Sequence, residues 1–233
     1  MKKTAIIIGI LFLIQFVLGV LLNQFLIGPI TFDPDYLVIA SVNTSQLIIG
    51  TFISILSGAL TVWIAVKLFP FFKPFSHTLA LVYVGFSVVS FTVTLIDIVG
   101  VLSLLSVSIE YTNPEMQNAD FLKTIGTIFY AIRVWTHYLV LLIAALNLTV
   151  FYSALFISKL LPRFISTWGL LAVSLMLAAL ILNIFDVITF ETEMMLFLPL
   201  AINQLVLIAW LLIKGFSESN NFNTSHTTKL DIQ

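Results

Sequence analysis

The chain has 233 residues, of which 60% are hydrophobic and only 9% are charged, and its formal net charge is −1. Soluble domains carry about 25% charged residues, so this composition excludes an ordinary water-soluble enzyme and a disordered chain. The near-neutral charge gives no attraction to nucleic acid, and the lack of cysteine excludes disulfides and cysteine-bound metals. The remaining class is a helical membrane protein.

Six apolar stretches are long enough to cross a bilayer core of about 30 Å, which takes roughly 20 residues per helix. They are continuous runs rather than short alternating segments, so we expect an all-α bundle of six transmembrane helices. The predicted spans cover about residues 4–27, 46–69, 78–107, 124–157, 165–190 and 195–213. They form one transmembrane domain, residues 1–216, and we expect the polar tail, residues 217–233, to be mobile and cytoplasmic.

The first predicted span follows two lysines, as the apolar region of a signal peptide would. Its apolar run is longer than such a region and no small-residue cleavage site follows it, so we expect a retained helix. Residues 28–45 are predicted to be a loop, because Pro29 and Pro34 break a helix. A second loop on the same side is predicted over residues 111–123.

Basic residues between the spans indicate the orientation, because cytoplasmic loops carry the positive excess. With six spans, one side of the membrane has only Lys123 together with most of the acidic residues. The other side has Lys2, Lys3, Lys67, Lys73, Lys159, Arg163, Lys214 and Lys229. We therefore expect both termini to be cytoplasmic and the lipid bilayer to be the main partner.

Polar side chains at helical spacing form one stripe on each of three predicted spans. Counting about 20 residues per crossing from the cytoplasmic ends places Asp97, Asp186 and Arg133 near the outer boundary, with His137 one turn deeper. Ionisable side chains facing lipid cost about 2.5–3.5 kcal/mol or more at mid-membrane, so we expect the stripes to face the bundle interior. The predicted chamber also contains Asn183, Asn203 and Gln204.

Three interpretations of the charged residues near the outer boundary stay open. In the first, Arg133 is the fixed positive charge of a polar chamber that opens to the outside. It pairs there with Asp97 or Asp186, and His137 forms hydrogen bonds within the chamber. In the second, the charges form a structural ion pair that joins three helices. In the third, Arg133 extends to the lipid headgroups.

Motifs for other chemistries are missing from the sequence. The three histidines, His77, His137 and His226, lie at different predicted depths, so we expect no haem or metal site and no cofactor. There is no nucleophile elbow, zinc-protease motif or phosphate-binding loop, and we assign no catalytic residue.

Gly50, Ser54 and Gly58 lie at four-residue spacing on one side of the second predicted span. A row of small residues lets two helix backbones approach closely. The row marks packing within the bundle or, alternatively, a face for a second copy of the chain or for a partner membrane protein.

Four motifs in chain order resemble a known family. They are Gly9-Ile10-Leu11-Phe12-Leu13-Ile14, Tyr83-Val84-Gly85-Phe86, Leu161-Pro162-Arg163 with Trp168-Gly169, and Asn203-Gln204-Leu205 with Trp210 and Lys214-Gly215-Phe216. Their order over residues 3–216 resembles the bacterial membrane family catalogued as domain of unknown function 4386. The resemblance implies a multi-helix protein of the bacterial cytoplasmic membrane and implies no activity. Ser87 and Ser90 stand where members often carry charges.

Three functions are compatible with these patterns. The leading one is a non-enzymatic carrier or binder of a small or lipidic ligand that uses the polar chamber. The second is an accessory or regulatory membrane subunit, for which Gly50, Ser54 and Gly58 should form an exposed ridge. The third is an intramembrane enzyme that uses His137 as acid or base, for which a carboxylate should lie within hydrogen-bond distance of His137.

Overall fold

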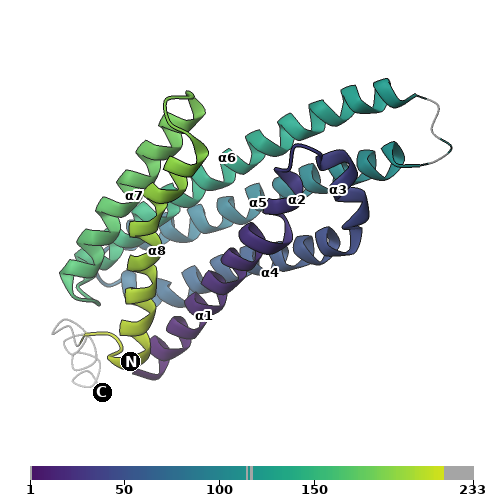
Figure 1. The fold of residues 1–233 in the computed structure, drawn as a ribbon. Coiled ribbons are helices and arrows are strands. Elements are labelled where there is room, and N and C mark those ends of the chain that lie inside the picture. The colour runs from purple at the N-terminus through teal and green to yellow at the C-terminus, as the bar shows by residue number, and fades with distance from the viewer. Residues whose placement is uncertain (1, 114, 116–117, 218–233) are drawn as a thin grey trace, which may run out of the picture. The chain divides into compact units, whose positions relative to one another are not determined.

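The computed structural model describes residues 2–113, 115 and 118–217. Every regular element within these residues is a helix, as Figure 1 shows, which confirms the predicted all-α class. The helices are α1 (Lys2–Leu21), the π-helix η1 (Leu22–Leu26), α2 (Gly28–Thr31), α3 (Tyr36–Val42), α4 (Thr44–Phe72), α5 (His77–Tyr111), α6 (Ala119–Ser158), α7 (Arg163–Ile184) and α8 (Phe190–Ile213). Residues 218–233 of the predicted tail lie outside the described residues.

Six described segments are long and apolar enough to span a membrane, which confirms the predicted number of spans. They are Lys2–Thr31, Thr44–Phe72, His77–Tyr111, Ala119–Ser158, Arg163–Ile184 and Phe190–Ile213. Helices α5 and α6 have 35 and 40 residues. At 1.5 Å per residue these are about 50 and 60 Å long, well above a bilayer core of about 30 Å. Both helices therefore have length beyond what one perpendicular crossing needs.

Two compact units make up the chain. Unit 1 comprises Met1–Leu13, Val66–Tyr83 and Leu148–Gln233, and unit 2 comprises Ile14–Ala65 and Val84–Asn147. Helices α1, α4, α5 and α6 contribute residues to both units. Helices α7 and α8 belong to unit 1, whereas η1, α2 and α3 belong to unit 2.

Residues 28–45 in unit 2 are not the helix-free loop that the prolines predicted, because this segment contains α2 and α3 (Figure 1). Pro29 stands in the first turn of α2, where its missing N–H has no helical partner to lose. Pro34 lies in the turn between the two short helices. The prediction was wrong because proline disrupts a helix in its interior and not at its start.

The chain passes from α1 to α2 through η1, whose backbone hydrogen bonds reach five residues back. Gln46 on α4 donates a hydrogen bond to the carbonyl of Phe25 in η1 at 2.7 Å, so this polar side chain satisfies an irregular stretch of backbone. A Cβ on Gly28 would overlap the carbonyl oxygen of Asn23. Glycine is therefore required where the chain leaves η1.

An apolar cluster in unit 2 joins the short helices to the longer ones. Its buried members are Ile27, Ile30, Ala40, Leu47, Val101 and Leu105. They come from α2, α3, the beginning of α4 and the second half of α5, and from the residue that precedes α2. The cluster therefore fixes the 28–45 segment against α5.

Unit 1 has an aromatic core beside the hairpin of α7 and α8. The ring of Phe151 on α6 stacks on Tyr83 of α5 with centroids 5.5 Å apart. Phe151 also contacts the rings of Phe12, Phe72 and Tyr152. Aromatic pairs in these geometries contribute about 0.5–1.5 kcal/mol each beyond their buried area, so this cluster stabilises the junction of α1, α4, α5 and α6.

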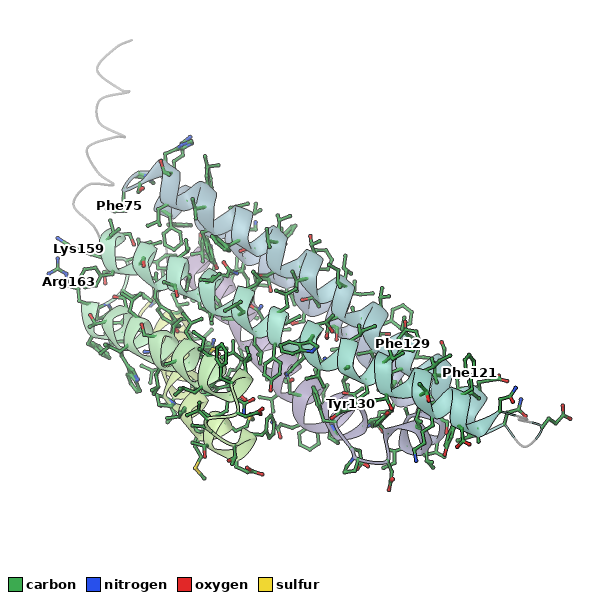
Figure 2. All side chains as sticks on the ribbon, turned by 90° about the horizontal axis from the view of Figure 1, so that it is seen from above. Phe75, Phe121, Phe129, Tyr130, Lys159 and Arg163 are labelled. Carbon is green, nitrogen blue, oxygen red and sulfur yellow. The ribbon has the colours of Figure 1, made fainter. Side chains whose placement is uncertain are left out.

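The junction between α6 and α7 carries two basic residues, Lys159 and Arg163, which Figure 2 labels. Lys159 directly follows α6 and has a left-handed backbone (φ 54°), and Pro162 precedes the first residue of α7. Both basic side chains are exposed. This end of unit 1 was predicted to face the cytoplasm.

We predict that Gly169→Ala destabilises the protein. Gly169 on α7 packs against the ring of buried Tyr152, and a Cβ there would overlap the ring atoms. Overpacking a core costs about 1–3 kcal/mol, so the midpoint of thermal unfolding in detergent should fall by roughly 2–10 °C. The control is Gly19→Ala on α1, where no atom lies within 4 Å of the new Cβ. Similar shifts for the two variants would contradict the packing assigned to Gly169.

Candidate functional site

Helices α5 and α6 present their predicted polar stripes to each other in unit 2. Ser87 on α5 donates a hydrogen bond to Oδ1 of Asn147 on α6 at 3.3 Å. Further along the same pair of helices, Asp97 on α5 meets Arg133 on α6. Gly100 on α5 faces Arg133 and Thr136 of α6, and a Cβ there would make ordinary van der Waals contact, 3.7 Å from the Cα of Arg133. Polar contacts at two positions along the helices thus fix the antiparallel register of α5 and α6.

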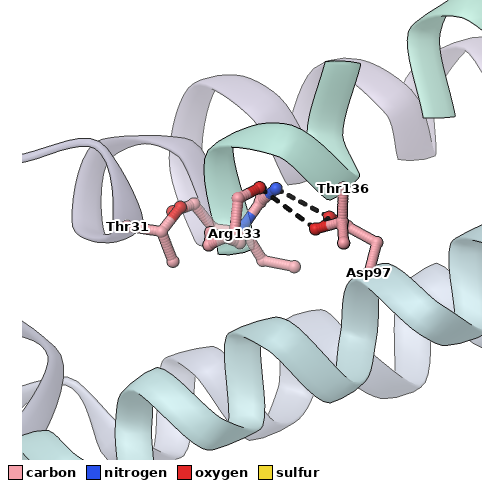
Figure 3. Close-up of polar contacts among 5 residues, drawn as sticks. Thr31, Asp97, Arg133 and Thr136 are labelled. Carbon is pink, nitrogen blue, oxygen red and sulfur yellow. Dashed lines mark hydrogen bonds and ion pairs between the residues drawn. The ribbon is translucent and has the colours of Figure 1, made fainter. Parts of the chain in front are cut away.

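The centre of the site is an ion pair between Arg133 and Asp97, drawn in Figure 3. Nη1 of Arg133 donates to Oδ1 of Asp97 at 2.8 Å, and the hydroxyl of Thr136 donates to the same oxygen at 2.8 Å. The side chains of Arg133 and Asp97 are 3% and 15% exposed. Enclosure removes most solvent screening, so breaking this pair would leave an uncompensated charge.

Phe32, the residue that follows α2, covers the guanidinium. Its ring centroid lies 4.9 Å from Cζ of Arg133, which is within the range of a cation–π contact. The same ring lies edge-on to the His137 ring, with centroids 5.1 Å apart. Thr31 of α2, also labelled in Figure 3, is fully buried and donates a hydrogen bond to the carbonyl of Ile27 at 3.0 Å. The 28–45 segment therefore closes one side of the site.

Helix α3 holds this cover in place through contacts with α5 and α6. The ring of Tyr36 stacks on that of Tyr130, labelled in Figure 2, with centroids 4.6 Å apart. Ser108 on α5 donates a hydrogen bond to the carbonyl of Leu37. Gly126 on α6 faces the side chain of Leu37, where a Cβ would come within 2.8 Å of Cδ2. The cover is thus attached to both helices that supply the ion pair.

The guanidinium of Arg133 is incompletely hydrogen-bonded. Its Nε is buried and has no hydrogen-bond partner among residues 2–113, 115 and 118–217. Arginine can donate five hydrogen bonds and often pairs with a carboxylate through two of them, whereas one joins Arg133 to Asp97 here. The guanidinium is thus buried and paired with Asp97, and it retains the capacity to donate to a further acceptor.

Asn183 and Asp186 form the end of α7 in unit 1. The amide of Asn183 donates to the carbonyl of Ile188 at 3.2 Å. Asp186 is exposed and has a left-handed backbone (φ 55°). The N–H of Val187 bonds to the carbonyl of Leu182, and that of Asp186 to the carbonyl of Asn183, which is the Schellman pattern of a helix end. Of the two acids predicted as partners of Arg133, the one in the observed ion pair is Asp97.

Asn203 and Gln204 lie on α8 in unit 1. Asn203 is fully buried, and its amide donates to the carbonyl of Ile165 on α7 at 3.0 Å. Its Oδ1 has no hydrogen-bond partner within the described part of the chain. Gln204 is half-buried. Asn203 thus joins the two helices of the hairpin, while its place in a polar chamber with Arg133 stays a prediction.

Gly50, Ser54 and Gly58 are buried in unit 2. A Cβ on Gly50 would lie 2.7 Å from Cγ1 of Ile27, and one on Gly58 would overlap the ring of Phe91 on α5. The hydroxyl of Ser54 donates to the carbonyl of Gly50 at 2.9 Å. The row packs against residues of its own chain and does not form the exposed ridge expected of an accessory subunit.

His137 contacts the ring of Phe32, while Oδ1 of Asp97 accepts hydrogen bonds from Arg133 and Thr136. Within the described residues no hydrogen bond joins His137 to a carboxylate, the contact that was expected for an acid–base role of this histidine. The same residues contain no group of three or more histidine and acidic side chains that could hold a metal ion.

Two residues of the site, Thr136 and Phe32, were not predicted. Thr136 lies three residues after Arg133 and directly before His137, so helical spacing alone could have added it to the polar stripe. Phe32 lies in the segment that was predicted to be a loop. No local pattern indicates that its ring reaches a guanidinium about 100 residues later, because this contact depends on how α2 and α3 pack.

Six apolar spanning helices with a charged pair enclosed between two of them define a multi-pass helical membrane protein. The chain belongs to the family described as Domain of unknown function (DUF4386), which matches residues 7–215. This match confirms the resemblance carried by the four motifs. No curated protein and no solved structure matches the chain.

We predict that Asp97→Asn and Arg133→Gln each lower the free energy of unfolding by about 3–5 kcal/mol, because each leaves a buried charge unpaired. The double variant should lose less than the sum of the single losses. Equilibrium unfolding in mixed micelles measures all three. Arg163→Gln is the control, since this exposed arginine should contribute about 0–1 kcal/mol. Strictly additive losses at Asp97 and Arg133 would contradict a coupled pair.

Proposed function

We propose that the chain is a non-enzymatic protein of the bacterial cytoplasmic membrane that binds a small or lipidic ligand through Arg133. The observation that carries this proposal is the buried guanidinium whose Nε has no partner within the described residues. A purely structural pair is stable when further hydrogen bonds satisfy the remaining donors. A ligand with an acceptor oxygen would supply the hydrogen-bond partner that Nε of Arg133 lacks.

The chemistry of arginine favours an oxyanion as that acceptor. The guanidinium presents donors in a planar fork that fits phosphate and carboxylate groups. Asp97 already balances the charge of Arg133, so a singly charged group such as a phosphodiester or a carboxylate suits the site better than a polyanion. Phe32 would then lie beside the apolar part of the ligand.

The position of the pair along its helices supports this class of ligand. Asp97 lies about 20 residues from the start of α5, and Arg133 lies about 25 residues from the end of α6. These separations correspond to about 30 and 38 Å, close to the thickness of the hydrocarbon core. The charge pattern of the loops predicts that this is the extracytoplasmic side, where both lipid phosphates and soluble anions are present.

We predict that phosphatidylglycerol or inorganic phosphate stabilises the wild-type chain in nanodiscs and that Arg133→Gln abolishes the effect. The stabilisation should follow ligand concentration, reaching about 2.7 kcal/mol at 100-fold excess over the dissociation constant. A shift with phosphatidylglycerol added to discs of a phosphate-free glycolipid identifies a headgroup, and a shift with inorganic phosphate in the same glycolipid discs identifies a soluble anion. Thermal unfolding provides the measurement.

Two further variants make this test decisive. Arg163→Gln removes an exposed arginine and should retain the full shift. Arg133→Lys keeps the charge but loses the planar fork, so it should fold and bind more weakly. Equal shifts in all variants, or none in the wild type with either probe, would refute a ligand site at Arg133.

The proposed orientation can be measured directly because the chain has no cysteine. Lys123→Cys, in the first turns of α6, and Lys73→Cys, in the turn after α4, place single thiols at two exposed lysines that are predicted to lie on opposite sides. In intact bacterial cells, an impermeant maleimide should label Lys123→Cys, and it should label Lys73→Cys only after permeabilisation. The reverse result would place the Arg133 site on the cytoplasmic side.

A further inference from the structure

Helix α8 begins with two acidic residues in very different surroundings. Thr189 caps the helix by accepting a hydrogen bond from the N–H of Thr192. Glu191 and Glu193 follow in the first turn. Glu191 is exposed, whereas Glu193 is only 2% exposed. Favourable interaction with the helix dipole can explain both acids, but it does not explain why one of them is buried.

The carboxyl of Glu193 has no counter-ion among the residues that the structure describes. Its Oε1 is buried without a hydrogen-bond partner among the described residues, and the ion pair found in that part of the chain joins Arg133 to Asp97. The nearby charged groups on α8 and at the end of α7 are Glu191 and Asp186, which are both exposed and both acidic. Neither can neutralise a carboxylate at Glu193.

The basic residues of unit 1 gather at the opposite end of α8. Lys214 directly follows the helix, about 31 Å from Glu193 along its axis. Lys2 lies beside Gly215, where a Cβ would come 3.5 Å from its Cγ. The ring of Phe71 contacts the ring of Phe216, with centroids 4.9 Å apart. Phe71 is close in the chain to the basic residues Lys67, Lys73 and His77. Lys159 and Arg163 flank Leu160, whose carbonyl accepts a hydrogen bond from Ser217.

Helix α8 carries further buried polar atoms without partners in the described chain. Besides Oε1 of Glu193, they are Oδ1 of Asn203 and Nε1 of Trp210. Pro199 lies between Glu193 and Asn203 and removes one backbone N–H from the helix. In a membrane-spanning helix such groups are costly and usually mark a functional path.

We infer that Glu193 is a proton-binding site at the start of α8, held as the neutral acid at neutral pH. An ionised carboxylate that is buried without a counter-ion costs far more free energy than the neutral acid. The proton therefore takes the place of the missing cation. This site is separate from the one at Arg133, so either can fail without the other.

A hydrophobic carbodiimide tests this inference, because it reaches carboxyls from the lipid phase and needs the protonated form. The acid transfers its proton to a carbodiimide nitrogen, and the carboxyl oxygen bonds to the central carbon. The adduct rearranges to a stable N-acylurea, so the whole reagent adds and nothing leaves. Among the 11 acidic residues of the chain, Glu193 should be the main adduct site in the full-length protein in native membranes.

Peptide mass spectrometry of the wild type locates the adduct without requiring any variant to fold. Labelling should disappear in Glu193→Gln, persist in Glu191→Gln as the matched control, and decline as the pH is raised from neutral to alkaline. A water-soluble carbodiimide should instead label exposed acids such as Glu191. Labelling of Glu191 by the hydrophobic reagent, labelling that does not depend on pH, or an unlabelled wild type would overturn the assignment.

Discussion

The ion pair between Asp97 and Arg133 organises the part of unit 2 where the ligand site is proposed. Arginine at membrane depth has to be paired and covered, because its charge is costly beside lipid. Asp97 and Thr136 supply the pairing, and Phe32 supplies the cover. The antiparallel register of α5 and α6 and the folding of the 28–45 segment into two short helices both serve this requirement.

The cover over Arg133 depends on residues that are unremarkable in the sequence. Gly28 allows the chain to continue from η1 into α2, and Gly126 leaves space for the side chain of Leu37. The ring of Tyr36 stacks on that of Tyr130. Because these contacts come from four separate segments, the site can be enclosed without any long polar network. The buried Nε of Arg133, which has no hydrogen-bond partner among the described residues, is the feature on which the proposed ligand site rests.

Unit 1 has a different character, since its core is aromatic and apolar. Gly169 lies against Tyr152, and Asn203 joins α8 to α7, so two of the motif residues that resemble the family contribute to packing. Asn183 and Asp186 close the hairpin turn. Polar side chains in the helices are therefore of two kinds. Some form hydrogen bonds with backbone carbonyls, and others, such as Glu193, have a buried polar atom without a partner in the described chain.

Composition and periodicity were sufficient to predict six apolar helices, because in lipid an apolar run of that length can satisfy its backbone only as a helix. Helical spacing also brought Asp97 and Arg133 onto facing stripes, since each is defined by its own helix. The choice of Asp97 over Asp186, the cover by Phe32 and the burial of Glu193 were decided only by tertiary structure. These features depend on contacts between segments far apart in the chain, and no local pattern contains that information.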